Sequence, residues 1–136
     1  MSDANVVSCD HIIHVDWLKQ AVLVFNDLAE AQEELGRLGA SAASGVALAG
    51  INAGTGGGAG YATNQIDGSG LFWVIFPGGN PKIGTIVHEV THAVDYLCEF
   101  TGIPVTVEAA EVRCYLVGWM TEMLVGFYGL EVKADV

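Results

Sequence analysis

Two histidines and a glutamate stand close together at His88, Glu89 and His92, in an H-E-x-x-H arrangement. Residues four apart share one face of a helix, so both imidazoles can be directed at a single metal ion with the carboxylate beside them. Zinc lowers the pKa of a bound water to about 7, and a neighbouring carboxylate can take its proton as the hydroxide attacks a carbonyl. The pattern therefore predicts a Zn²⁺ site with His88 and His92 as ligands and Glu89 as the general base.

Histidine is scarce in this chain, and two of its four copies lie in the motif. The alternative is a chance match inside a buried structural helix, because a short motif is a hypothesis until its structural context is known. The other pair, His11 and His14, is three residues apart; it shares a face in a helix but points to opposite sides in a strand. A second metal site at this pair therefore requires a helix.

The motif lies in a segment with helical periodicity. Residues 77–79 break the chain before it, Asn80 can cap the helix, and Pro81 fits the first helical position, where its missing N–H is not needed. Gly102 and Pro104 end the helix. One apolar face is predicted to pack, and it consists of Ile83, Ile86, Val87, Val90, Val94 and Leu97. The other side carries His88, His92, Asp95, Tyr96 and Glu99.

A catalytic zinc needs a third protein ligand, while its fourth position keeps water. A second helix is predicted at about residues 107–125, with Thr106 as its cap and an apolar side that meets the core. Glu108, Glu111 and Tyr115 recur at i, i+3 and i+7 and so share another face of this helix. A glutamate of this face, Glu111 or Glu108, is the predicted third ligand.

A small sheet is predicted before the metal helix. Residues 21–25 form an apolar strand, followed by a helix over residues 28–38 that Asn26 or Asp27 caps and Gly39 ends. Residues 61–66 and 71–76 are the arms of a hairpin that turns at residues 67–70. The second arm is apolar throughout, as in a strand covered on both faces. The first is more polar, and it is either an open edge that can bind an extended peptide or an ordinary solvated arm.

From about residue 61 to residue 123, the chain resembles a very small zincin of the Glu-ligand type, a gluzincin. In that superfamily a strand hairpin precedes the H-E-x-x-H helix and a later helix supplies a glutamate, which the stretch Glu111-Val-Arg-Cys-Tyr115 matches. The phrase from His88 to Tyr96, followed by Glu111 to Trp119, also resembles short metallopeptidases encoded in bacteriophage genomes.

The resemblance implies an α+β fold, a minimal zincin-like domain in which a small twisted sheet carries the metal helix and a Glu-bearing helix follows. It also implies His88, His92 and Glu111 as the zinc ligands and Glu89 as the base. Thermolysin-like members place an aspartate one turn after the ligand glutamate to orient a histidine, but Tyr115 stands at that position here.

Two more residues are candidates for the surroundings of the metal. Asp95, one turn beyond His92, either orients a ligand or is solvated. Tyr115 can donate a hydrogen bond to the oxyanion formed on an attacked carbonyl, or it can pack against the metal helix.

The chain carries 16 acidic against 5 basic residues, a net charge of -11. Nucleic acids and anionic membranes require clustered Lys and Arg, so neither is an expected partner. No run approaches the roughly 18 to 20 apolar residues of a membrane span, and the N-terminus lacks the charged and apolar regions of a secretory signal. We therefore expect a cytoplasmic protein, located in the host cytoplasm or the virion if it is viral.

The length of 136 residues fits a single zincin-like domain, residues 1–136, with flexible residues 1–10 and a Gly-rich loop at residues 52–60. Two functions fit this chain. One is a zinc-dependent hydrolase with a peptide or protein substrate, which the intact Glu89 favours because a structural zinc site needs no base. The other is a weakly active or inactive zincin-shaped module for binding or structure, for example in an oligomer or viral particle. The small size favours it, since little material is left for a deep cleft.

Overall fold

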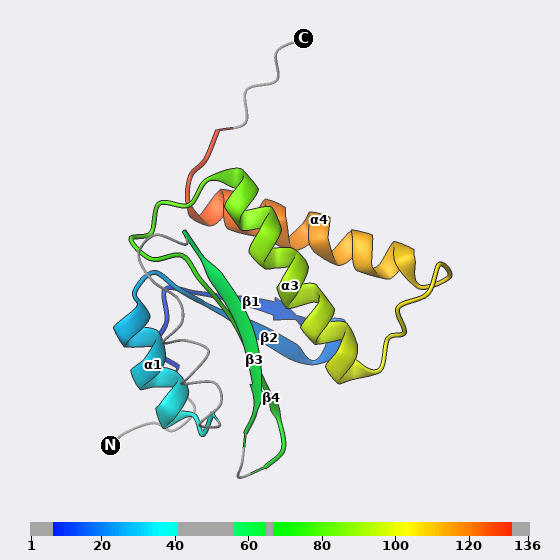
Figure 1. The fold of residues 1–136 in the computed structure, drawn as a ribbon, viewed down its shortest axis with the longest axis horizontal. Coiled ribbons are helices and arrows are strands. Elements are labelled where there is room, and N and C mark those ends of the chain that lie inside the picture. The colour runs from blue at the N-terminus through cyan, green and yellow to red at the C-terminus, as the bar shows by residue number, and fades with distance from the viewer. Residues whose placement is uncertain (1–6, 41–55, 65–66, 132–136) are drawn as a thin grey trace.

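The computed structural model describes residues 7–40, 56–64 and 67–131. In chain order the elements are β1 His11–Val15, the short 3-10 helix η1 Asp16–Leu18, β2 Gln20–Phe25, α1 Leu28–Arg37, β3 Gly58–Thr63, β4 Gly70–Ile75, α3 Ile83–Thr101 and α4 Ala110–Phe127. One sheet separates α1 from α3 and α4, which cover its other face (Figure 1). The predicted α+β class is confirmed.

The sheet has the strand order β1-β2-β4-β3. Its central strands β2 and β4 run parallel, in a register that extends from Val22 opposite Phe72 to Phe25 opposite Ile75. Both are buried along most of their length, which explains their uninterrupted apolar sequences. β1 and β3 pair antiparallel on the outer sides, so β3 is an edge strand, as the hairpin pattern had suggested.

Alternate residues of the central strands enter two separate cores. The larger core lies under α3 and α4 and includes Val22, Val24, Phe72, Val74, Ile86, Val90, Val94, Leu97, Leu116, Met120 and Leu124. The smaller core lies under α1 and consists of Leu23, Phe25, Ala31, Leu35, Ala62, Trp73 and Ile75. The period of two along each strand therefore assigns every second residue to one of the two helical layers.

The edge strand begins earlier than its sequence suggests. β3 covers residues 58–63 instead of 61–66, so the last residues of the expected Gly-rich loop are already paired with β4. The reason is the lack of a side chain at Gly60, which lets the ring of Trp73 pack against its backbone. Residues 41–55 and 65–66, which include the beginning of the expected Gly-rich loop and the end of the expected first hairpin arm, lie outside the described part of the chain.

The ends of the helices were predicted only in part. Asp27 caps α1 by accepting a hydrogen bond from the backbone N–H of Glu30 at 2.9 Å, and Gly102 ends α3 in the left-handed conformation at φ 79°. However, α3 starts at Ile83 after Lys82, so Asn80 and Pro81 precede the helix. α4 begins at residue 110 instead of 107.

Two further segments bear on the sequence-based expectations. The backbone N–H of Ser8 donates a hydrogen bond to the buried Glu34, and Asp10 accepts one from the N–H of Asn26 at 2.7 Å, so these residues are attached to the domain. Residues 1–6 lie outside the described chain. Among the helices that the structure describes, none combines the length and apolarity that crossing a membrane demands.

The packing of β3 can be tested at Gly60. An added Cβ would lie 2.5 Å from Cζ2 of Trp73, which is 1 % exposed, so Gly60→Ala should lower the free energy of unfolding by about 1–3 kcal/mol. Gly118→Ala is the matched control, because no atom lies within 4 Å of a Cβ there, on the exposed face of α4. It should raise stability by about 0.5–1 kcal/mol. Denaturant unfolding measures both, and an unchanged Gly60→Ala would contradict the described packing.

Candidate metal centre

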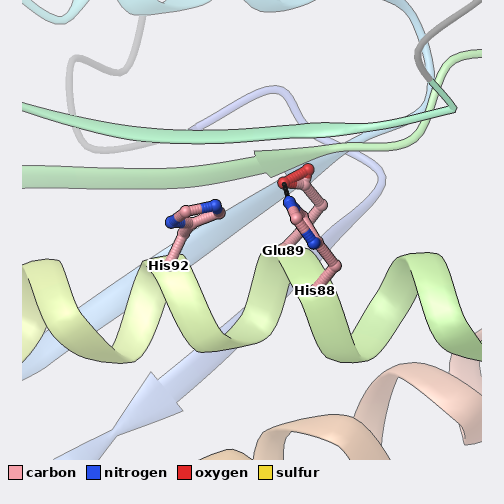
Figure 2. Close-up of side chains that lie close together, drawn as sticks. All are labelled: His88, Glu89 and His92. Atoms are coloured by element: carbon pink, nitrogen blue, oxygen red, sulfur yellow. Dashed lines mark ion pairs between the residues drawn. The ribbon is translucent and has the colours of Figure 1, made fainter.

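The side chains of His88, Glu89 and His92 converge on one side of α3, facing strands β3 and β4 and turned away from α4 (Figure 2). Donor atoms of all three lie within 4.8 Å of one another. Among the described residues, no other group of three or more His, Cys, Asp or Glu side chains is this close. The structure thus brings together the residues that the motif predicted, and they could hold a metal ion.

The two imidazoles are open to solvent, whereas the carboxylate is covered. The ring centroids of His88 and His92 are 4.9 Å apart with an interplanar angle of 75°. His88 Nε2 lies 3.9 Å from Glu89 Oε1, with the His88 side chain 70 % exposed and that of Glu89 8 % exposed. The cluster therefore combines two solvent-accessible imidazoles with a buried carboxylate beside them.

The backbone directly before β3 lies close to Glu89. A Cβ at Gly57 would lie 3.1 Å from its Cγ atom, so glycine is what allows the strand to approach. Burial raises the pKa of Glu89 above its ordinary value, and positive charge on His88 or His92 opposes this rise. A carboxylate with a raised pKa is a stronger proton acceptor, which is the property that a general base requires.

A hollow of about 430 Å³ opens beside the cluster and is lined by Gly57, Gly84, Thr85, His88 and Glu89. Its size is within the range of small-molecule binding sites. Two of the five lining residues are glycines, so backbone and not side chains forms part of its wall. A substrate group in this hollow would have direct access to both His88 and Glu89.

The predicted third ligand does not join the cluster. Glu111 is exposed in the first turn of α4, on a solvent face that it shares with Tyr115, Gly118 and Glu122. Glu108 is exposed in the turn before α4, where the Thr106 hydroxyl accepts a hydrogen bond from the N–H of Ala109 at 3.2 Å. The apolar side of α4 packs on the flank of α3 that is opposite the histidines (Figure 2). A glutamate ligand from this region stays a prediction.

The structure also places the two other candidates away from the cluster. Asp95 accepts a hydrogen bond from Arg113 Nη2 at 2.6 Å, so its carboxylate is turned toward α4 and orients neither histidine. This ion pair raises the pKa of Arg113. Tyr115 is 63 % exposed on the outer face of α4, so it does not pack against α3 as expected.

Two tyrosines next to the cluster were given no role by the sequence. The ring of Tyr96 stacks on His92 with a centroid distance of 6.3 Å and an angle of 17°. The ring of Tyr61 in β3 contacts the ring of Tyr96, with 5.1 Å between the two ring centroids. The spacing of four between His92 and Tyr96 was a usable signal, but only the tertiary structure brings Tyr61 alongside.

His11 and His14 do not form a second site. They lie on strand β1, where residues three apart point to opposite faces of the sheet. His11 stacks on Phe127 of α4 at 4.2 Å, and His14 is exposed. The stacking of His11 on Phe127 indicates that His11 has a packing role.

No protein-family model, no curated protein and no solved structure matches this chain. The chemistry of the cluster formed by His88, Glu89 and His92 therefore carries the functional conclusion.

Metal binding should depend on the two histidines. The protein should bind about one Zn²⁺ per chain and melt at a higher temperature with it, because an ion that binds only the folded chain stabilises it. His88→Ala and His92→Ala should each weaken binding by at least about tenfold. Calorimetric titration of the metal-free protein with Zn²⁺ measures these affinities. A wild-type protein that binds no Zn²⁺ would exclude the site.

The same titration decides the third ligand. With α4 in the orientation that the structure describes, Glu111→Gln should leave the Zn²⁺ affinity within about twofold of wild type, because Glu111 faces solvent. Glu108→Gln makes the same change at the alternative candidate ligand and serves as the comparison. A loss of about tenfold or more in Glu111→Gln alone would show that Glu111 binds the metal, which requires a rotation of α4.

Proposed function

We propose that this chain is a zinc-dependent peptide hydrolase of the zincin type, with Glu89 as its general base. One observation carries the proposal: the carboxylate of Glu89 is buried beside two exposed imidazoles and lines an open hollow. Two imidazoles on one side of a helix are ligands that suit zinc. The donor atoms of His88 and His92 and the carboxylate of Glu89 all lie within 4.8 Å of one another. His88 and His92 would hold the ion. When bound, zinc acts as a Lewis acid that polarises a carbonyl and acidifies water.

In the proposed reaction, Glu89 moves the proton. Its ionised carboxylate can accept a proton from a water molecule in the hollow while the oxygen of that water attacks the carbonyl carbon of a peptide. The new C–O bond forms as the O–H bond breaks. Glu89 can then deliver the same proton to the amine nitrogen when the C–N bond breaks. The burial of Glu89 supports this role, because it raises the pKa of the carboxyl toward neutrality.

The edge strand supports a peptide as the substrate. β3 pairs with β4 on one side and with no other described strand on the other. Gly57, the residue directly before β3, lies close to Glu89. An extended peptide that adds to the free side of β3 through backbone hydrogen bonds would run along the cluster, whatever its side chains.

The orientation of α4 favours a second candidate function. With Glu111 on the solvent face, the described residues contribute only two histidines to the cluster besides its proposed base, Glu89. A catalytic zinc is usually held by three protein ligands. A zincin-shaped binding or structural module, such as a component of a viral particle, needs no complete catalytic set.

The substitution Glu89→Gln separates the two functions. The amide keeps the shape of the side chain but cannot accept the proton, so peptide cleavage should fall by at least about a hundredfold. Zinc affinity should stay close to that of wild type, because the proposed role of Glu89 is not that of a ligand. Mass spectrometry of a broad peptide mixture, incubated with zinc-loaded protein, measures the cleavage. Glu122→Gln on the exposed face of α4 is the matched control and should cleave like wild type.

Three other outcomes are informative. If wild type and Glu89→Gln both bind zinc and neither cleaves any peptide, the binding module replaces the hydrolase. Equal cleavage by the two proteins would rule out Glu89 as the base and indicate a contaminating protease. Cleavage that persists after chelation of the metal would exclude a zinc mechanism.

A further inference from the structure

A row of aromatic rings connects the core to His92. Phe72 of β4 is 1 % exposed, and Tyr61 of β3 stacks on it at 5.9 Å with an angle of 14°. The ring centroids of Tyr61 and Tyr96 of α3 are 5.1 Å apart, and those of Tyr96 and His92, which stack, are 6.3 Å apart. We call these four rings, Phe72, Tyr61, Tyr96 and His92, the aromatic row. Its inner end is fixed in the core, and its outer end is an imidazole of the cluster.

Each contact in the row has a separate structural cause. Tyr61 and Phe72 are direct partners in the register of β3 and β4, which brings their side chains together on one face of the sheet. His92 and Tyr96 are four residues apart on α3 and so lie on one side of the helix. The packing of α3 beside β3 joins the two pairs. The row therefore exists only when hairpin and helix are both in place.

The row makes the two histidines unequal. The ring of His92 is supported by Tyr96. The side chain of His88 is 70 % exposed, and its ring contacts and ion pairs with the described residues involve only His92 and Glu89. A stacked aromatic pair contributes a favourable interaction with a defined geometry. A ligand held in its binding rotamer before the metal arrives loses less conformational freedom on binding.

We propose that Tyr96 is a positioning residue that, with Tyr61 behind it, holds the imidazole of His92 ready to bind a metal ion. The inference rests on the metal centre of the proposed function, though not on the hydrolysis. The ring and not the hydroxyl of Tyr96 is the active part, since the contacts are between rings. His92 is the pre-ordered ligand, and His88 becomes ordered when the ion binds.

The first test measures Zn²⁺ affinity by calorimetry. Tyr96→Leu removes the ring and should weaken binding by about two- to tenfold, while Tyr96→Phe keeps the ring and should bind like wild type. Tyr115→Leu is the matched control, because the same change at an exposed tyrosine on the outer face of α4 should have no effect. If Tyr96→Phe binds as weakly as Tyr96→Leu, or if Tyr96→Leu binds like wild type, the proposal is wrong.

The second test needs no metal and therefore stands even if the protein binds none. NMR relaxation of the two imidazole rings in the metal-free protein reports how ordered each ring is. His92 should be more ordered than His88 in wild type and in Tyr96→Phe, and the two should become alike in Tyr96→Leu. Equal order in wild type, or a loss at both histidines in Tyr96→Leu, would overturn the proposal. Absence of zinc binding combined with an ordered His92 would reject the metal centre alone.

Discussion

The contact between α3 and the sheet determines where every candidate functional group lies. Ile86, Val90, Val94 and Leu97 are fully or almost fully buried against the strands, and this apolar stripe fixes the rotation of α3 about its axis. Glu89 then lies at the border of the stripe, close to the backbone directly before β3, while His88 and His92 lie beyond the border in solvent. A small rotation of α3 would expose Glu89 or bury the imidazoles. Core packing is therefore what sets the chemistry of the cluster.

The two sides of α3 make different contacts. On the β3 flank, an edge strand, a hollow and two tyrosines surround the cluster. On the other flank, α4 packs through Leu116, Met120 and Leu124, and Arg113 pairs with Asp95. Arg113 and the apolar side of α4 both face α3 in this second contact. Glu111 and Tyr115 therefore lie on the solvent-exposed face of α4, away from the histidines. Whether a glutamate of α4 can act as the third ligand therefore depends on the orientation of α4 and not on the H-E-x-x-H motif.

The three side chains of the cluster differ in their exposure to solvent, and this difference agrees with the roles proposed for them. A metal ligand must reach an ion that arrives from solvent, and a general base gains proton affinity when it is removed from water. Here the imidazoles are exposed and the carboxylate is covered, which is consistent with the roles proposed for them. The aromatic row adds order where exposure alone would leave a ligand mobile. Its support reaches His92 only, so the two histidines differ in spite of their identical chemistry.

Local rules were enough to predict much of this molecule from sequence. The spacing of four fixed the convergence of His88 and His92, the apolar runs identified the central strands, and Asp27 and Gly102 marked helix ends, because each of these depends on a few neighbouring residues. Tertiary contacts decided the rest. The spacing placed Glu111 and Tyr115 on one face of a helix, but which face turns toward α3 depends on how the whole apolar side of α4 packs. Likewise, Tyr61 and Gly57 meet the cluster only because β3 pairs with β4 beside α3, and no periodicity within a single element encodes the contact between two.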